Sequence, residues 1–261
     1  MISNKHSYRY EVITSENGLF NNYIDVAYII TMENSTRRND YMEQINKYNP
    51  HSKIVIQHNK GFKKCTKQLY KQNTIHDLND AYYHAFLHAK SNNYNNVLIF
   101  EDDFFFDNVK KEDVHEIGMF IKNNNYHIYN LGPIINIGIN KTLYHKQNII
   151  MTSAHGVIYN TIYFDYYIKN YNKLRSDEPN DQLWNDISLI KYSYYKPICF
   201  QLFPITENCK NWSSYWYASY LIKITKLDKS HKSYYKLTSF FTFTSYLIIL
   251  FVLYYILYTN K

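Results

Sequence analysis

Three consecutive carboxylates, Glu101, Asp102 and Asp103, directly follow a short apolar run at residues 97–100. Such a run predicts a buried strand, and open α/β sheets bind ligands at the carboxyl ends of their strands. Alternate side chains of an extended backbone point the same way, so Glu101 and Asp103 are placed to share one divalent cation. The alternative interpretation is a solvated acidic turn, which is common at strand ends.

Two arginines, Arg37 and Arg38, come soon after another apolar run at residues 24–31. Guanidinium groups bind phosphate well, so we expect the two arginines to contact a nucleotide or its phosphates; the alternative is that they are ordinary solvent-exposed side chains.

His84 and His88 share one face of a predicted helix, but no Glu follows His84, so the zinc-peptidase signature is absent. For His88 we expect a packing role.

The segments around these residues alternate between apolar runs typical of strands and stretches with helical spacing. Strands are expected at 24–31, 53–58, 97–100, 127–131, 153–159 and 197–203, and helices after residue 35, from residue 74 and over 181–190. This alternation predicts an α/β fold with a mostly parallel central sheet flanked by helices.

Composition excludes several classes of site. The chain has only 6 glycines, and none of them forms a glycine-rich dinucleotide or P-loop motif.

The net charge of +7 comes mainly from residues 209–236, which hold six lysines and one aspartate. Residues 1–208 carry 22 basic and 21 acidic side chains. A nearly neutral body disfavours a nucleic-acid partner. Nucleic-acid binding would require those lysines to bind polyanions and the C-terminal tail to be soluble.

Residues 237–258 contain no charge and would form a helix of about 33 Å, enough for the hydrocarbon core of a bilayer. We expect a single-pass C-terminal membrane anchor, with a buried core helix as the alternative. Lysines before the span place the main domain on the cytosolic side.

The N-terminus has no apolar segment that predicts a signal peptide. The three cysteines, Cys65, Cys199 and Cys209, are widely spaced, so the sequence predicts no disulfide framework.

The predicted organisation has four segments. They are a loosely attached arm at 1–22, an α/β domain at 23–212, a basic juxtamembrane segment at 213–236 and a transmembrane helix at 237–258.

Six stretches occur in an order that resembles glycosyltransferase family 25, which includes lipopolysaccharide and collagen galactosyltransferases. They are AYIITMENSTRR at 27–38, AYYHAF at 81–86, VLIFEDD at 97–103, SAHGVIYN at 153–160, PNDQLWND at 179–186 and KPICFQLFP at 196–204. The resemblance covers roughly residues 24–212 and implies a GT-A (Rossmann-like) fold.

The resemblance also implies a reaction. A metal-dependent enzyme of this kind moves a hexose from UDP-galactose or UDP-glucose to a hydroxyl acceptor on a protein, glycan or lipid-linked sugar, with inversion. Asp103, with Glu101 or Asp102, would hold Mn²⁺ or Mg²⁺, and Asp102 and His84 would border the donor.

The catalytic base implied by the resemblance is Asp181, with Asp177, Glu178 and Asp186 as competitors that also suit a helix N-terminus. A different class of function stays open, that of a catalytically silent, membrane-anchored scaffold or virion structural protein. Loss of metal and nucleotide binding at the acidic cluster would favour it.

Overall fold

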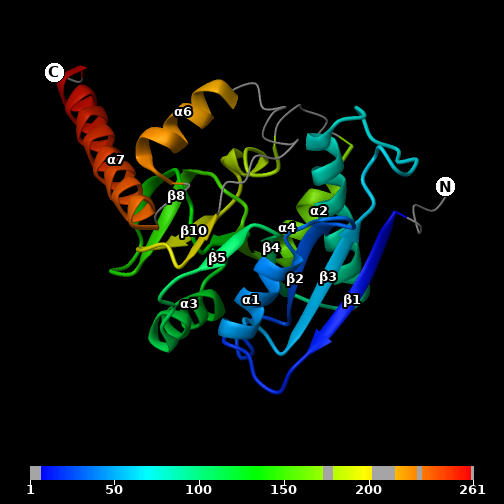
Figure 1. Cartoon of the computed structure of the whole chain (residues 1–261). Coiled ribbons are helices and arrows are strands. Elements are labelled where there is room, and N and C mark those ends of the chain that lie inside the picture. The colour runs from blue at the N-terminus through cyan, green and yellow to red at the C-terminus, as the bar shows by residue number, and fades with distance from the viewer. Residues whose placement is uncertain (1–6, 173–178, 202–214, 228–230, 260–261) are drawn as a thin grey trace.

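A computed structural model describes residues 7–172, 179–201, 215–227 and 231–259 (Figure 1). Its strands are β1 Tyr8–Thr14, β2 Val26–Met32, β3 Lys53–Asn59, β4 Asn96–Glu101, β5 Phe104–Phe106, β6 Ile128–Asn130, β7 Asn136–Asn140, β8 His145–Met151, β9 Gly156–Asn160, β10 Lys191–Tyr194 and β11 Cys199–Gln201. Its helices are α1 Arg38–Tyr48, α2 Thr74–Ser91, α3 Lys111–Asn123, α4 Thr161–Asn170, α6 Tyr215–Thr225, α7 His231–Thr259 and the 3-10 helix η1 Leu183–Asn185.

The described strands form one nine-stranded sheet in the order β1-β3-β2-β4-β9-β6-β10-β8-β7, with β11 and β5 in a separate pair. The neighbours β2–β3, β2–β4 and β6–β10 are parallel, and the other five neighbouring pairs are antiparallel. The expected α/β class is therefore right, but the expectation of a mostly parallel sheet is wrong. The longest run of parallel strands is the trio β3-β2-β4, whose carboxyl ends lie side by side.

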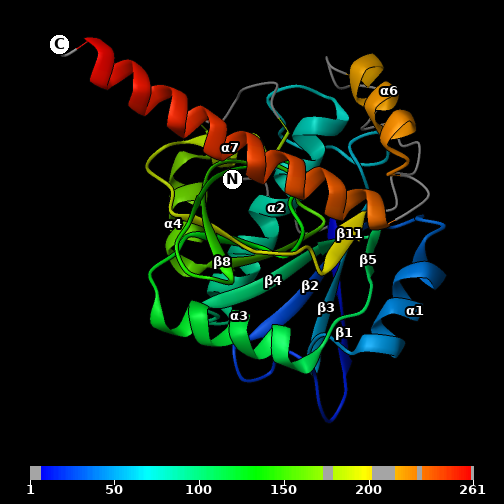
Figure 2. The ribbon, with the colours of Figure 1, turned by 90° about the vertical axis from the view of Figure 1, so that its left-hand side faces the viewer.

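Alternate residues of the buried strands feed two hydrophobic cores, one on each face of the sheet. Ile29 of β2 packs in the core covered by α1 and α3, whereas its neighbour Tyr28 packs in the core covered by α2 and α4. The result is a three-layer arrangement in which helices cover both faces of the central strands (Figure 2). Tyrosine is a major core residue, and Tyr82, Tyr129 and Tyr159 are fully buried.

Two local expectations from the sequence are wrong. The described part of the segment 1–22 is not loosely attached, because β1 pairs with β3 along its whole length, from Tyr8 opposite Asn59 to Thr14 opposite Lys53. The helix expected over 181–190 is only the short η1 followed by turns. The Asp186 carboxylate accepts the backbone N–H of Ser188, and the Lys191 ammonium binds the carbonyl oxygens of Trp184 and Asp186. These bonds compete with helix continuation.

The basic segment 213–236 contains α6 and the first residues of α7. Among the described helices, α7 alone is long and apolar enough to cross a membrane, over Lys232–Thr259, and only 6% of its most apolar stretch is buried. The alternative of a buried core helix is therefore wrong. The end of α7 projects away from the body (Figure 1).

Two buried histidines make the fold sensitive to acid. Burial lowers the pKa of His155 and of His145 to about 4. His155 Nε2 lies 3.0 Å from the Cys199 carbonyl oxygen, and His145 Nδ1 lies 2.7 Å from the Tyr129 hydroxyl. Both rings are therefore neutral in the folded protein at pH 6, whereas the unfolded chain takes up protons near pH 6.5.

We predict that the free energy of unfolding falls as the pH drops from 6.5 to 4.5, by roughly 2 kcal/mol for each such histidine. The unfolded state binds more protons in this window, so acid favours it. Denaturant unfolding of the parent and of His145→Gln in mild detergent measures the effect. The variant should lose less stability with acid, and parallel pH curves would contradict the prediction.

Candidate functional site

A cavity of about 620 Å³ opens at the carboxyl ends of β3, β2 and β4. The chain passes from β2 to β3 on one side and then returns to β4 on the other side of β2. Ligands of open α/β sheets bind at such a switch point, because the two loops diverge there and leave a crevice. The cavity is lined by residues 30–37, residues 59–64, the start of α2, Glu101 to Asp103, and Gln201 of β11.

Asp102 ties the ends of β2 and β4 together. Its Oδ1 accepts a hydrogen bond of 2.5 Å from Arg37 Nη1. Its Oδ2 accepts bonds of 2.7 Å from both Thr31 Oγ1 and Ser35 Oγ. Because both oxygens are occupied by protein donors, Asp102 works as a clamp that fixes the Arg37 guanidinium at the cavity wall.

Asp103 and Glu101 have a different environment. Asp103 is 5% exposed, and its Oδ2 accepts a 3.0 Å bond from Gln201 Nε2, while its buried Oδ1 has no hydrogen-bond partner in the described structure. Glu101 Oε1 accepts a 3.0 Å bond from the Tyr82 hydroxyl. Burial raises the pKa of Glu101, and repulsion from Asp103 raises it further. Burial likewise raises the pKa of Asp103.

These features fit a divalent cation held by two protein carboxylates. An unpartnered buried oxygen is costly, and a cation would satisfy it. Among the described residues, no group of three or more His, Cys, Asp or Glu side chains is arranged to hold a metal. Mg²⁺ commonly takes only one or two carboxylates and completes its shell with substrate phosphates and water. Asp103 and Glu101 match that smaller donor set, and the occupied Asp102 does not add to it.

The opposite wall of the cavity is basic. Lys60, Lys63 and Lys64 come from the loop after β3, in which Gly61 has φ +79. The positive φ favours glycine at this position, whereas the nearest side-chain atom, the terminal methyl of the flexible Met32, could move aside for a Cβ. Basic side chains facing an acidic floor suit a ligand that carries both a cation and phosphate groups.

The buried Lys67 fixes this basic loop. Its ammonium donates to Asp77 Oδ1 at 2.6 Å, to Asn59 Oδ1 at 2.6 Å and to the Tyr8 hydroxyl at 2.8 Å. Asp77 Oδ2 also accepts the backbone N–H of Phe62 at 3.2 Å. Loop, β1 and α2 are thereby joined around one buried charge, which neutralises Asp77 at the cavity wall.

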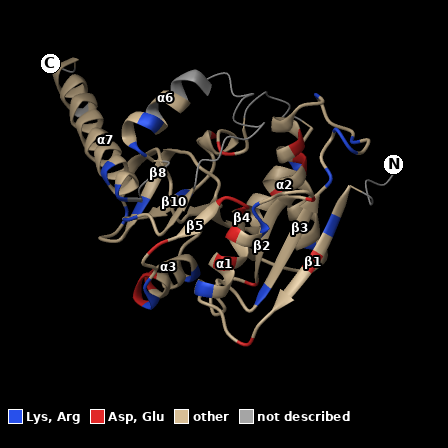
Figure 3. Ribbon diagram, in the orientation of Figure 1, with Lys and Arg blue, Asp and Glu red and all other residues tan. Residues whose placement is uncertain are grey.

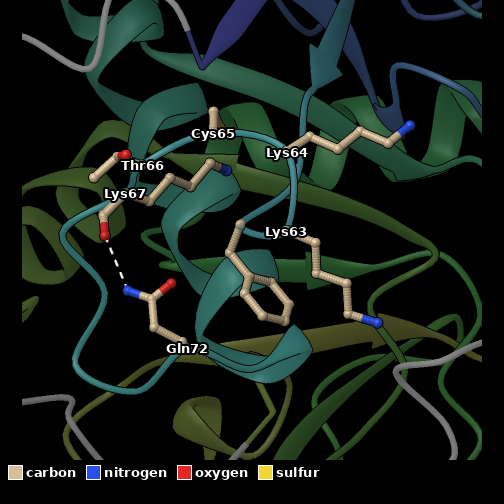
Figure 4. A pocket seen from close by; sticks show the side chains of 7 residues that line it. Lys63, Lys64, Cys65, Thr66, Lys67 and Gln72 are labelled. Atoms are coloured by element: carbon tan, nitrogen blue, oxygen red, sulfur yellow. Dashed lines mark hydrogen bonds between the residues drawn. The ribbon is translucent and has the colours of Figure 1, made fainter.

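A smaller pocket of about 410 Å³ lies on the other side of the same loop and is lined by residues 62–67 and Gln72 (Figure 4). Gln72 Nε2 donates to the Lys67 carbonyl oxygen at 3.0 Å, which closes the loop on itself. Lys63 and Lys64 extend away from that closure, whereas Lys67 turns inward (Figure 4). Both lysines border the larger cavity as well.

Of the predicted donor-binding residues, Arg37 and Asp102 line the cavity, whereas Arg38 and His84 are not among its lining residues. Arg38 forms an ion pair of 2.7 Å with Glu11 of β1, whose pKa it lowers to about 2. His84 stacks against Tyr8 at 4.4 Å between ring centroids, and burial lowers its pKa. His88 packs as expected, with its Nδ1 2.6 Å from the Tyr28 hydroxyl.

The predicted base, Asp181, lies in a turn before η1, not at a helix start. Its Oδ2 accepts the backbone N–H of Ser153 at 2.8 Å, and its charge raises the pKa of Glu101. Burial raises the pKa of Asp181 itself. Asp186 instead bonds the Tyr166 hydroxyl at 2.5 Å at the protein surface. Asp177 and Glu178 lie outside the described residues.

Sequence reasoning missed two parts of the site. Lys67 lies in the loop before α2, and no sequence motif marks it as the partner of Asp77. Gln201 was assigned only to a strand, yet it supplies the hydrogen bond to Asp103. No local pattern marks this contact, because the two residues are 98 positions apart.

No protein-family model matches the chain, and no curated protein sequence matches it significantly. Among solved structures, A197 from STIV aligns with a TM-score of 0.41 at 8% identity, over 70% of this chain and 86% of that one. Apo UDP-glucose pyrophosphorylase aligns with a TM-score of 0.38 at 8% identity, over 82% and 80%. The same enzyme complexed with UDP-glucose gives 0.38 at 9% identity, over 82% and 79%.

Similarities this low assign neither a fold family nor a function to this chain. The structure supports the broader description, an α/β domain with a large mixed sheet and a C-terminal apolar helix. The resemblance to glycosyltransferase family 25 stays a prediction from the sequence.

The clamp predicts unequal roles for the two adjacent arginines. Arg37→Met should lower the free energy of unfolding by about 1–3 kcal/mol, because it leaves the sheltered Asp102 carboxylate without its cationic donor. Arg38→Met should cost less than about 1 kcal/mol, because its ion pair with Glu11 is exposed and screened by water. Denaturant unfolding of the two variants checks the order, and equal losses would contradict it.

Proposed function

We propose that this protein is a metal-dependent glycosyltransferase that moves a hexose from a UDP-sugar to a hydroxyl acceptor with inversion. The observation that carries the proposal is the cavity at the switch point between β2 and β4, where Asp103 offers an unpartnered buried oxygen. The identity of the donor as UDP-galactose or UDP-glucose, and the inversion, come from the resemblance to family 25.

Asp103 and Glu101 would hold Mn²⁺ or Mg²⁺, which when bound neutralises the charge that develops on the leaving diphosphate. Their raised pKa values reflect repulsion and burial, which an incoming cation relieves. In the absence of a cation, the ionised forms of the two carboxyl groups are thus unfavourable, and binding of the metal–nucleotide complex would stabilise them.

Arg37 is the residue best placed to meet a phosphate oxygen. The Asp102 clamp holds its guanidinium in one orientation before any ligand binds, so little side-chain entropy is lost on binding. Arg37 Nη1 also lies 3.9 Å from Asp103 Oδ2, which places it beside the cation ligands. Lys60 and Lys64 add positive charge on the far wall of the cavity.

Asp181 would accept the proton of the acceptor hydroxyl. Burial raises its pKa, as a base working near neutral pH requires. It is not among the residues that line the cavity, but contacts link it to Glu101. The Tyr82 hydroxyl bonds Glu101 and lies 3.3 Å from the Ala154 carbonyl oxygen, and the adjacent Ser153 binds Asp181. Ser153 has φ 84, a strained backbone that presents its N–H to this carboxylate.

We also propose that α7 anchors the protein in a membrane with the α/β domain on the cytosolic side. Its apolar residues are exposed along most of its length, and Lys223 of α6, Lys226 after it and two lysines in the first turns of α7 precede the apolar stretch (Figure 3). Lysine-rich flanks favour the cytosolic side of a span.

The metal role predicts a binding defect. Asp103→Asn should weaken Mn²⁺-dependent binding of UDP-glucose or UDP-galactose at least tenfold, because the amide keeps the shape of the side chain but loses the charge that attracts the cation. Titration calorimetry on the full chain in detergent, with and without Mn²⁺, measures this affinity.

The matched control is Asp165→Asn, which removes an exposed carboxylate of α4 that pairs with Lys90. The control should bind the donor as the parent does. If neither UDP-sugar binds the parent, the silent scaffold becomes the better description. If Asp103→Asn binds normally, the cation is held elsewhere.

The role of Asp181 predicts a defect in turnover and not in binding. Asp181→Asn should lower kcat by about 10²–10⁴-fold with the affinity for donor unchanged, because proton removal from the acceptor is lost. Sugar transfer to a panel of hydroxyl acceptors, measured beside calorimetric donor affinity, separates the two quantities. Unchanged kcat would assign the base to another residue.

A further inference from the structure

The helix α7 has two parts with different surroundings. Its first part packs on the α/β domain, with Tyr234 against Phe200 of β11 and later residues on the edge strand β7, and Tyr234, Thr238 and Ser245 are at most 4% exposed. Their spacing of four and seven places them on one helical face. Two polar contacts secure that face, from the Gly138 N–H to Ser245 Oγ and from Lys146 Nζ to Thr242 Oγ1, both 3.3 Å.

The second part, residues 246–259, has no such cover. Phe251, Tyr254 and Leu257 are each more than 65% exposed, and the exposed apolar side chains point in all directions around the helix. A helix that is apolar on all sides belongs in lipid. These 14 residues rise only about 21 Å, however, which is short of the roughly 30 Å hydrocarbon core.

A bilayer span must therefore include some of the docked part of α7. The outward face of that part is apolar, with Phe240 at 58% and Phe243 at 62% exposure. Because the opposite face is attached to β7, sinking Phe240 and Phe243 into lipid draws the sheet edge to the membrane surface. The domain is then held against the bilayer, not tethered at a distance.

The edge that this geometry brings to the membrane is the β7–β8 hairpin. Leu143 at its turn is 77% exposed, and Tyr144 beside it is 40% exposed. Ile139 and Ile149 on its strands are 49% and 59% exposed. Lys141, also exposed, stands at the same turn. Leucine and tyrosine next to a lysine match the composition of segments that lie in the interfacial zone of bilayers.

We propose that the β7–β8 hairpin is a second membrane-contact element, with Leu143 and Tyr144 inserted at the headgroup level of a lipid surface. The inference rests on the membrane location of α7 proposed above. The lipid occupant is favoured because the apolar hairpin is continuous with the apolar α7, which packs on the same edge strand. In the other direction, the sheet ends at β1, far from α7 (Figure 1).

The test adds one tryptophan to the full chain, at Leu143 or at Val12. Val12 is the matched control, since it is a 52% exposed apolar residue of β1 at the opposite edge of the sheet. Each protein is reconstituted in vesicles of phosphatidylcholine with a minor share of phosphatidylserine. The emission of the added tryptophan is taken as the difference from the parent, and brominated phosphatidylcholine reports contact with lipid.

We expect Leu143→Trp to emit at shorter wavelength in vesicles and to be quenched by the brominated lipid, while Val12→Trp stays water-exposed and unquenched. If the protein floats with vesicles but both tryptophans behave alike, the hairpin inference fails and the anchor stands. If the protein does not float, the anchor itself fails. A blue shift at Leu143→Trp without bromolipid quenching would show that protein, not lipid, covers the hairpin, which overturns the lipid assignment.

Discussion

The clamp formed by Asp102 is the interaction on which the candidate site depends. Its carboxylate joins Thr31 at the end of β2, Ser35 and Arg37 in the following loop, and its own position after β4. Parallel strands on either side of a switch point have diverging loops, so something must hold those loops at a fixed separation. With Asp102 fully occupied, its neighbours Glu101 and Asp103 are left to serve a ligand. One carboxylate organises the wall, and the other two are the ones that we propose to bind the cation.

The same division between structural and functional charge recurs on the basic side. The ammonium of Lys67 is buried and satisfied by three oxygen partners, so it fixes the loop and cannot also bind a ligand. Lys60, Lys63 and Lys64 then stand on a rigid segment. A cavity with carboxylates at its floor and lysines at its rim disfavours an anion alone, which the carboxylates repel. It also disfavours a cation alone, which the lysines repel. A cation–diphosphate complex meets both walls.

Much of the fold was predictable because the central strands are short apolar runs and α2 has a clear helical period. Wherever a wrong expectation arose, the deciding interaction was non-local or polar. The sheet is mixed because β9 inserts between β4 and β6, and no local pattern specifies that pairing. The strand β1 does alternate apolar and polar residues from Tyr8 to Glu11, but its partner β3 is distant in the sequence, so its pairing was not foreseen. The helix over 181–190 failed because Lys191 occupies carbonyl groups that a helix would use.

The site was predictable to the extent that chemistry is local. Glu101, Asp103 and Arg37 could be selected from their places at strand ends, since the parallel trio brings those ends together. Arg38 was a poor candidate because the strand β1, unseen in the sequence, supplies its partner Glu11. His84 likewise packs against Tyr8 of β1. One missed edge strand therefore accounts for two of the donor-site residues that do not line the cavity.

The helix α7 and the cavity are physically connected through β11. Gln201 donates its side-chain amide to Asp103 Oδ2, and its backbone N–H donates to the Tyr234 hydroxyl of α7 at 3.1 Å. Tyr234 is buried against Phe200, so the first turns of α7 help to hold the strand that orients Asp103. A chain cut before α7 would lose this support. The docked helix is thus part of the scaffold of the acidic cluster, and for this reason the proposed donor binding is tested on the full chain.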